Sequence, residues 1–262
     1  MLDRPDAATA AALARLYDLD LQDDPGDLDL YLALADRADG AILELAAGTG
    51  RLAVPLALAG HPVTAVDRDP AMLDRGRAHA AAAAVPPDRL AFVEADLVDL
   101  VLPDAGRYAF AFIALNSIML LASRDAQRAA FRTLATHLAP GGLAAVDVWL
   151  PDAEDLGRFD GRVILEWPRT ESDSGAVVTK VGSAQHDVAT NTITLHAIYE
   201  EGRQGEAPHR WIRQDRLRLV SADELAAFAE EAGLRVEILA GGYDLSPIGP
   251  GSERAVVVAE RR

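Results

Sequence analysis

A short glycine-rich segment is the feature of this sequence that points most directly to chemistry. Gly48 and Gly50 flank Thr49 between an apolar stretch and a helix-like stretch. Glycines at such a turn let the backbone bend sharply and approach a ligand closely. In α/β proteins, ligands bind where a buried strand ends and a helix begins. The segment therefore predicts a ligand-binding turn.

An acid follows this turn at the distance expected for a nucleoside site. Asp67 ends the next apolar stretch, 19 residues after Gly48, and a carboxylate there accepts hydrogen bonds from ribose hydroxyls. The glycines also fit the G-x-G-x-x-G/A dinucleotide pattern. By itself, the turn therefore leaves open a dinucleotide site, or a turn that needs glycine only for its geometry.

Further polar residues and the end of the chain favour a cationic adenosine ligand over a pyrophosphate. Glu44 lies in the strand before the glycines, where a carboxylate suits a cation and is unfavourable beside a pyrophosphate. Asp96 follows the third apolar stretch, where it can accept a hydrogen bond from an adenine amino group, and Asn116 follows the fourth. After Gly233, two apolar stretches predict a hairpin instead of further strand–helix–strand units.

Together these motifs resemble those of the class I S-adenosylmethionine-dependent methyltransferases. The resemblance rests on residues 44–50, 67–73, 94–96 and 138–142, and it extends over residues 41–148. The nearer relatives are small-molecule methyltransferases of bacterial type, in which an N-terminal helix and an antiparallel β insert build the acceptor pocket. The resemblance implies S-adenosylmethionine as cofactor and S-adenosylhomocysteine as product. It also implies methylation of a nitrogen or oxygen of a small molecule, mainly through proximity and orientation.

The resemblance also assigns cofactor-binding residues. It places Glu44 near the amino group and sulfonium, Asp67 at the ribose hydroxyls and Asp96 at the adenine edge. Arg68 departs from the pattern, because the family often has an apolar residue beside the adenine. The expected cofactor-binding residues are Glu44, Ala46, Gly48, Gly50, Asp67, Arg68, Met72, Asp96, Leu97 and Asn116.

Acceptor-binding residues are expected among the aromatic and basic side chains outside the glycine motif, whose alternative role is packing. The expected set is Tyr17, Tyr31, Trp167, Tyr199, Arg213 and Tyr243. The catalytic residues stay unknown. His186, His196 and Tyr17 are the candidates for a general base, although methyl transfer does not require one. The histidines show no metal-ligand spacing, so no metal site is expected.

The alternation of apolar and helix-like stretches predicts an α/β fold class. Residues 41–148 contain five apolar stretches separated by helices or short connections, which is typical of parallel strands joined by crossovers. A helix and two terminal strands complete a Rossmann-like, doubly wound, mostly parallel sheet of seven strands with a C-terminal antiparallel hairpin. Residues 163–219 alternate like strands between short turns, which predicts an antiparallel β insert over the active site.

This pattern divides the chain into three expected parts. Residues 1–40 form an N-terminal helical cover. Residues 41–150 and 220–262 form a Rossmann-like core that binds S-adenosylmethionine. Residues 151–219 form the β insert, which serves as the acceptor pocket or its lid.

Composition excludes several classes of partner. The formal net charge is −16, so the chain repels nucleic acid and anionic membrane surfaces at long range. There is no cysteine, so neither disulfides nor thiolate chemistry are available. No apolar stretch is long enough to span a bilayer. We therefore expect a soluble, cytoplasmic protein that acts on a small-molecule acceptor, and homo-oligomerisation is left open.

Two other functions remain open from the sequence alone. One is an NAD-dependent oxidoreductase that uses the same glycine turn, and the other is a catalytically inactive protein that binds S-adenosylmethionine or S-adenosylhomocysteine. A nucleic-acid methyltransferase is disfavoured by the charge. It is also disfavoured by the residues after the fourth strand, which read Leu115-Asn116-Ser117-Ile118 instead of a base-flipping motif of the Asn-Pro-Pro-Tyr type.

Overall fold

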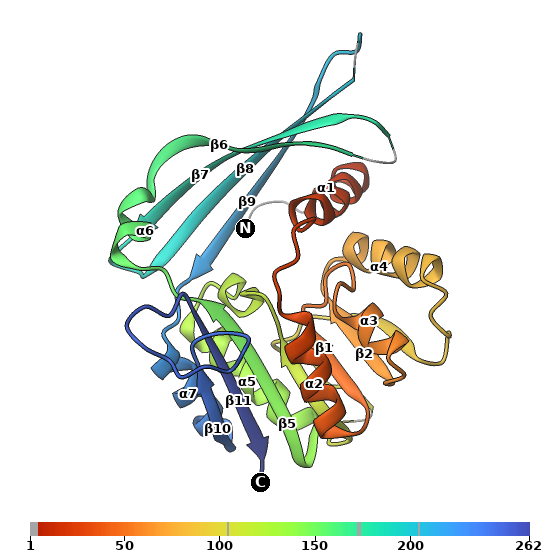
Figure 1. The fold of residues 1–262 in the computed structure, drawn as a ribbon, viewed down its shortest axis with the longest axis vertical. Helices are drawn as coiled ribbons and strands as arrows, with labels where there is room; N and C mark the ends of the chain where they lie inside the picture. Colours follow the sequence, from red (N-terminus) through yellow and green to blue (C-terminus); the bar gives the residue numbers. More distant parts are fainter. Residues whose placement is uncertain (1–4, 104, 172–173, 204) are drawn as a thin grey trace. The chain divides into compact units, whose positions relative to one another are not determined.

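The computed structural model describes residues 5–103, 105–171, 174–203 and 205–262, and these fall into two compact units (Figure 1). The insert unit comprises residues 1–24 and 151–219, and the core unit comprises residues 25–150 and 220–262. The expected N-terminal cover is therefore divided, because its first part belongs to the insert unit and the remainder to the core unit. Each unit is described below by itself.

A seven-stranded sheet forms the centre of the core unit, in the order β10-β11-β5-β4-β1-β2-β3. The strands are β1 (Ile42–Leu45), β2 (Val63–Asp67), β3 (Leu90–Glu94), β4 (Tyr108–Ile113), β5 (Leu138–Trp149), β10 (Leu234–Ala240) and β11 (Arg254–Arg261). The first five pair in parallel. β11 pairs antiparallel with β5, and β10 pairs antiparallel with β11. This arrangement confirms the predicted Rossmann-like sheet with its antiparallel C-terminal pair.

Helices connect these strands, and several of them begin at residues that the sequence marks. They are α2 (Leu28–Ala38), α3 (Ala53–Leu58), α4 (Pro70–Ala82), the 3₁₀ turn η1 (Ser117–Leu120), α5 (Arg124–His137) and α7 (Ala222–Glu231). Ser123 caps α5 by accepting a hydrogen bond from the Ala126 amide. Ser221 and Glu224 form a capping box at the start of α7, which satisfies two amides that the helix leaves unpaired.

The start of β5 has an unusual composition for a strand. Pro140, Gly141 and Gly142 are residue types that favour turns, but β5 begins at Leu138, directly after α5, and runs through them. The register between β4 and β5 shifts here, and a Cβ on Gly142 would lie 2.9 Å from the carbonyl oxygen of Tyr108. Glycine therefore allows the two backbones to approach where the strand begins.

Aromatic side chains fill the space between α2 and the sheet. Tyr31, Phe110 and Phe112 are fully buried. The rings of Tyr31 and Phe112 are 4.6 Å apart, and those of Phe110 and Phe112 are 5.1 Å apart. Burial of each such side chain contributes about 1.5–3 kcal/mol to folding. This packing holds α2 against the strands whose ends carry the expected site.

The insert unit is built on a four-stranded antiparallel sheet in the order β6-β7-β8-β9. The strands are β6 (Asp160–Thr170), β7 (Val177–Asp187), β8 (Thr192–Gly202) and β9 (His209–Arg218). Helix α1 (Ala7–Asp20) lies along one face, where Leu16 packs against Val178 and Tyr199 (Figure 1). We call this face the inner face and the opposite one the outer face.

A short helix in the insert unit was not expected from the sequence. Helix α6 (Ala153–Arg158) begins with a capping box formed by Asp152 and Asp155. The box and the helix that follows it involve only a few residues, too few to show a helical periodicity in the sequence. It leads the chain directly into β6.

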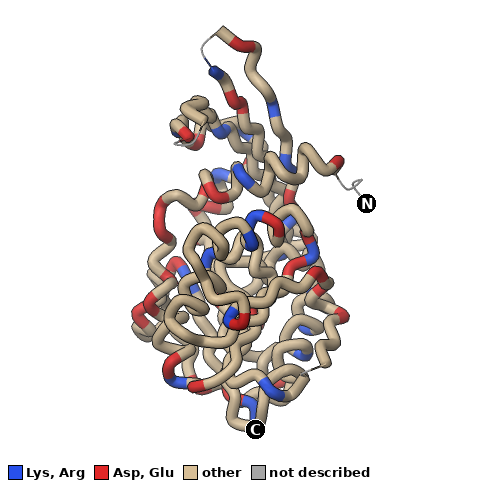
Figure 2. The backbone as a smooth tube through the Cα atoms, turned by 90° about the vertical axis from the view of Figure 1, so that its right-hand side faces the viewer, with Lys and Arg blue, Asp and Glu red and all other residues tan. Residues whose placement is uncertain are grey.

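Charged residues of both signs are distributed along both units. Figure 2 shows acidic and basic segments interspersed along the backbone. Among the helices formed by the described residues, none is both long and apolar enough to cross a membrane.

We predict that Gly76→Ala destabilises the protein. A Cβ on Gly76 in α4 would lie 2.7 Å from the ring of Phe92 and 3.2 Å from the backbone carbonyl carbon of Thr49. This overpacking should cost about 1–3 kcal/mol and exceed the helix-propensity gain of about 1 kcal/mol. Urea unfolding followed by circular dichroism measures the change.

Gly157→Ala is the matched control for this prediction. Gly157 also lies in a helix, α6, but a Cβ there would meet open space. The substitution should leave the free energy of unfolding unchanged or raise it slightly. Equal effects of the two substitutions would contradict the packing argument.

Candidate functional site

The turn between β1 and α3 has an unusual backbone. Ala46, Gly48 and Gly50 all have positive φ angles, of 58°, 56° and 77°. Glycine adopts this conformation readily, whereas a residue such as alanine does so at a cost of about 1–3 kcal/mol. The Ala47 amide donates to the carbonyl oxygen of Val66 at 2.9 Å. The chain thus maintains a strained turn at the end of β1.

Asp67 ties this turn to the end of β2. Its Oδ2 accepts a hydrogen bond from the Gly48 amide at 2.8 Å, and its Oδ1 accepts one from the Asp69 amide at 2.9 Å. Burial raises the pKa of this carboxyl, and the two backbone amides oppose that rise. The 19-residue spacing seen in the sequence therefore places the acid directly against the glycine turn.

A cavity in the core unit lies at the ends of these strands. It is lined by Ala46, Val66, Asp67, Arg68, Ala95, Asp96, Leu97, Ser117, Leu120 and Leu121. Half of the expected cofactor-binding residues are in this set, namely Ala46, Asp67, Arg68, Asp96 and Leu97. Leu120 and Leu121 of the η1 region are cavity residues that were not predicted, because their apolar side chains resemble those of core residues in the sequence.

The other expected cofactor residues lie elsewhere in the core unit. Gly48 and Gly50 form the turn itself, and Met72 lies in the first part of α4. Asn116 follows β4 with a φ of 64°, and its Oδ1 accepts a hydrogen bond from the Trp149 amide. Asn116 therefore holds the end of β5, whatever else it contacts.

Glu44 is a buried acid with an unused oxygen. It lies within β1 and is 4% exposed, and its Oε2 has no hydrogen-bond partner among the described residues. Burial raises its pKa to about 8, and repulsion from Asp27 and Asp67 adds to the rise, while Arg51 opposes it. The carboxyl is therefore mostly protonated at neutral pH in the absence of a ligand.

A buried ion pair joins the start of α2 to the glycine turn. Arg51 donates through both terminal nitrogens to the two carboxylate oxygens of Asp27, each at 2.6 Å. The Asp27 side chain is fully buried. Such two-point pairs fix orientation as well as distance. Neither residue was singled out from the sequence.

Asp147 in β5 gathers partners from four separate segments. Its Oδ1 accepts from the Tyr31 hydroxyl at 2.6 Å and from the Leu115 amide at 2.9 Å. Its Oδ2 accepts from the Tyr243 hydroxyl at 3.0 Å and from Arg254 at 2.6 Å. The carboxylate thereby holds Leu115, which has a φ of 50°, directly before Asn116 and the 3₁₀ turn that lines the cavity.

The Asp147 cluster gives two expected acceptor residues a clear structural role. Tyr31 is fully buried, and burial and the nearby Asp147 charge raise its pKa well above the usual value. The pKa of Tyr243 is raised for the same two reasons. Both hydroxyls donate to Asp147, so neither is poised to accept a proton. In the sequence, the sign of this cluster is Asp147 itself, an acid inside the otherwise apolar stretch of residues 143–148.

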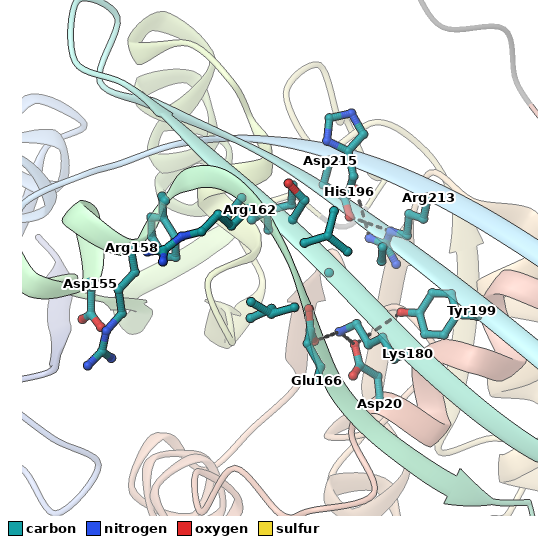
Figure 3. Close-up of a pocket in the computed structure, with 18 of the residues that line it drawn as sticks. Asp20, Asp155, Arg158, Arg162, Glu166, Lys180, His196, Tyr199, Arg213 and Asp215 are labelled. Carbon is teal, nitrogen blue, oxygen red and sulfur yellow. Dashed lines mark hydrogen bonds and ion pairs between the residues drawn. The ribbon is translucent and has the colours of Figure 1, made fainter.

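A second cavity, of about 700 Å³, lies within the insert unit (Figure 3). This volume is typical of small-molecule sites, which span about 300–1,000 Å³. The charged residues that line it are Asp20, Asp155, Arg158, Arg162, Glu166, Lys180, Arg213 and Asp215. Among the residues expected to bind the acceptor or act as a base, those that line this cavity are Tyr17, Tyr199, Arg213 and His196. Trp167 and His186 do not line it.

Asp20 is the centre of a polar network on one wall of this cavity (Figure 3). Its Oδ2 is 2.6 Å from the ammonium nitrogen of Lys180 and accepts from the Tyr199 hydroxyl at 3.4 Å. Its Oδ1 accepts from the indole nitrogen of Trp167 at 2.9 Å. Lys180 also pairs with Glu166 at 2.8 Å. Two carboxylates therefore share one ammonium group.

The candidate general bases differ in their surroundings. His186 lies near the end of β7, and its Nε2 is buried without a hydrogen-bond partner among the described residues. His196 is opposite Ser183 and Gln214 in the sheet register. Tyr17 lies in α1 at the cavity wall. A catalytic role for any of these three stays a prediction.

We predict that Glu44 makes the stability of the unliganded protein fall with rising pH. Below pH 4.5 the carboxyl is protonated in both folded and unfolded chains and contributes nothing. Between pH 4.5 and 8 the unfolded chain ionises, while the folded chain, with a pKa of about 8, keeps its proton. The unfolded state therefore gains up to about 3–5 kcal/mol, and the effect levels off above pH 8.

Glu44→Gln tests this prediction, because the amide does not titrate in this range. The difference in the free energy of unfolding, variant minus native, should increase steadily from pH 5 to pH 8 in urea titrations. Glu154→Gln in α6, an exposed position, serves as the control and should show a much smaller slope. A flat difference for Glu44→Gln would show that the buried carboxyl ionises normally.

Comparisons with known proteins agree with this geometry. Residues 42–142 match the family model described as a methyltransferase domain. The CcbJ methyltransferase from Streptomyces caelestis has a similar structure, with a TM-score of 0.74 and 25% identity over 92% of this chain and 98% of that one. No curated protein sequence matches the chain.

Two further solved structures share the fold. An S-adenosylmethionine-dependent methyltransferase from Clostridium acetobutylicum has a TM-score of 0.78 at 17% identity, over 95% of this chain and 98% of that one. The sugar N-methyltransferase KedS8 from Streptoalloteichus has a TM-score of 0.72 at 21% identity, over 94% of this chain and 92% of that one. The strained glycine turn therefore lies within a methyltransferase domain, residues 42–142, and the chain shares the fold of solved S-adenosylmethionine-dependent methyltransferases.

Proposed function

We propose that this enzyme transfers the methyl group of S-adenosylmethionine to a nitrogen of a small, polar amine. The proposal rests mainly on one wall of the insert cavity. The cavity as a whole is lined by four acids and four bases, but on this wall Asp20 and Glu166 together carry one more negative charge than Lys180 neutralises. A cationic amine suits such a wall. The core unit holds the donor, and the insert unit recognises the acceptor. A cytoplasmic location remains an expectation.

The residues of the core unit fit the cofactor. S-adenosylmethionine supplies an electrophilic methyl group on a sulfonium, together with an ammonium group. Glu44 offers a buried oxygen that lacks a partner among the described residues, and a nearby cation would favour its ionised form. Asp67 and Asp96 line the cavity, where they would accept from the ribose hydroxyls and the adenine amino group. Ser117 and the η1 residues close the same cavity.

The remaining expected cofactor residues have supporting parts in this proposal. Gly48 and Gly50 let the turn approach the cofactor closely, and their positive φ angles are consistent with that. Arg68 lines the cavity and would stack its guanidinium beside the adenine. Met72 in α4 would contact the adenine from the other side. Asn116 would act indirectly, by holding the backbone that leads into η1.

Catalysis in this proposal comes mainly from alignment. Methyl transfer from a sulfonium is a direct displacement, and holding the two reactants in line supplies up to about 7–11 kcal/mol of the barrier reduction. An amine attacks only when it is neutral, so a proton must leave it first. Asp20 and Glu166 are carboxylates at the cavity wall that can accept this proton directly or through water. The hydroxyls of Tyr31 and Tyr243 are committed to Asp147.

Structural neighbours support the choice of nitrogen. Their descriptions include a sugar N-methyltransferase, an amino pentose methyltransferase and a glycopeptide N-methyltransferase. These proteins share the fold at 19–21% identity. The insert cavity of this chain has a size compatible with a sugar-sized amine.

We predict that Asp67→Asn weakens binding of S-adenosylmethionine by about 10- to 100-fold, because a hydrogen bond to a charged group contributes about 1.5–3 kcal/mol. Isothermal titration calorimetry measures the dissociation constant, and thermal unfolding checks that the variant is folded. Asp74→Asn is the control, since Asp74 is exposed on α4 and should not affect binding. Tighter binding of NAD than of S-adenosylmethionine would contradict the cofactor assignment.

We predict that Ala184→Trp lowers kcat/KM for the acceptor by at least about 10-fold, because the indole would occupy a position on the cavity wall. The dissociation constant of S-adenosylmethionine should be unchanged. Gln185→Trp is the matched control, because the next residue on β7 is exposed and points to the opposite face.

The assay follows S-adenosylhomocysteine formation with a panel of amines, phenols and carboxylates. Turnover confined to phenols or carboxylates would contradict the proposal of nitrogen methylation. Equal loss of activity in both tryptophan variants would contradict the placement of the acceptor in this cavity.

A further inference from the structure

A row of apolar side chains crosses the outer face of the insert sheet from one edge to the other. Leu165 is paired with Val181, Val181 with Ile198, and Ile198 with Ile212. Directly paired residues lie on the same face of a sheet, so these four side chains form one continuous line across all four strands. We call it the outer row.

The outer row is exposed to solvent at its two ends and half-buried at Val181 and Ile198, although its residue types are typical of a core. Leu165 is 64% exposed and Ile212 is 61% exposed, and the adjacent Val163 is 68% exposed. An antiparallel sheet with one solvated face normally alternates apolar and polar residues, with the polar ones outside. Here the inner face packs against α1 through Leu16, while the outer face keeps its own apolar row.

The surroundings of the outer row are electrically neutral. On one side the register aligns Pro168, Thr179, Glu200 and Arg210, and the last two form an ion pair. On the other side it aligns Val163, Ser183, His196 and Gln214, the first three of which also contact the insert cavity. Lysine is absent from both lines, and their one acid is paired. This neutrality contrasts with the chain's net charge of −16.

The face is large enough for a stable interface. Four strands spaced about 4.8 Å apart, each about 10 residues long at about 3.3 Å per residue, cover about 650 Å². Two such faces in contact would bury about 1,300 Å² in total, which lies within the range of about 1,200–2,000 Å² for stable protein interfaces.

We propose that the outer face of the insert sheet stacks on the same face of a second copy of this chain, forming a two-fold dimer. With the two-fold axis along the outer row, each row packs against its own equivalent. The Glu200–Arg210 line of one copy then faces the uncharged Ser183–Gln214 line of the other. No like charges meet, and the apolar residues are removed from water.

A second copy fits this face better than a partner of a different kind. The face lacks the excess charge that would select an acidic or a basic partner, and it is complementary to itself when rotated. Two-fold contacts use the same patch on both copies. Two twisted sheets packed face to face at about 10 Å are also a common stable arrangement.

The oligomeric state tests the proposal directly. Sedimentation velocity over a range of protein concentrations should give a mass twice that of the 27.8 kDa chain. Ile212→Arg should shift the protein to the monomer, because it places two like charges opposite each other at one end of the outer row, within the interface. Val188→Arg is the matched control, since Val188 is 81% exposed in the turn after β7, and this variant should stay dimeric.

Crosslinking provides an independent test that does not depend on a disruptive charge. The chain has no cysteine, so Ile198→Cys creates one thiol per copy on the outer row. A short bismaleimide, which can span the roughly 10 Å between stacked sheets, should link two copies through this residue, whereas Val188→Cys should remain unlinked. Leu165→Arg repeats the charge test should Ile212→Arg fail to fold. A native protein that sediments as a monomer at all concentrations would overturn the proposal, as would a dimer that survives both arginine substitutions.

Discussion

The hydrogen bond from the Gly48 amide to Asp67 is the contact on which the core unit's cavity depends. It joins the end of β2 to a turn in which Ala46, Gly48 and Gly50 all have positive φ angles. Without an acceptor at that point, the buried amide would lose a partner and the strained turn would lose its anchor. The same carboxylate lines the cavity, so the residue expected to recognise a ribose also shapes the loop beside it.

Three acids lie along the sheet of this unit, Glu44 and Asp147 buried and Asp67 half-buried, and each is stabilised differently. Asp67 is held by backbone amides, and Asp147 is held by two tyrosines, an arginine and an amide. Glu44 lacks such a set of donors, and its pKa is correspondingly raised. A buried carboxyl costs free energy unless it is paired or protonated. The acid with the least internal compensation is therefore the one best placed to respond to an arriving cation.

Local patterns account for what the sequence predicted correctly. The spacing between Gly48 and Asp67 is short in the sequence, and the strand and helix periodicities predicted a mostly parallel seven-stranded sheet with an antiparallel C-terminal pair. Contacts between segments that lie far apart in the sequence could not be predicted from local patterns. The partners of Asp147 come from α2, the end of β4, the β10–β11 loop and β11. Likewise, α1 belongs to the insert unit because Leu16 packs on strands far along the chain.

The position of the chain's single lysine has a practical consequence. Lys180 is the only lysine among the 262 residues, and its side chain is 13% exposed between Asp20 and Glu166. The other strongly basic side chains are all arginines, which keep their proton at every accessible pH. Apart from the chain's own amino terminus, an amine-reactive reagent has one target, on the wall of the insert cavity. The rate at which that target is labelled would report, without any engineered probe, how often the cavity opens and whether a bound molecule shields it.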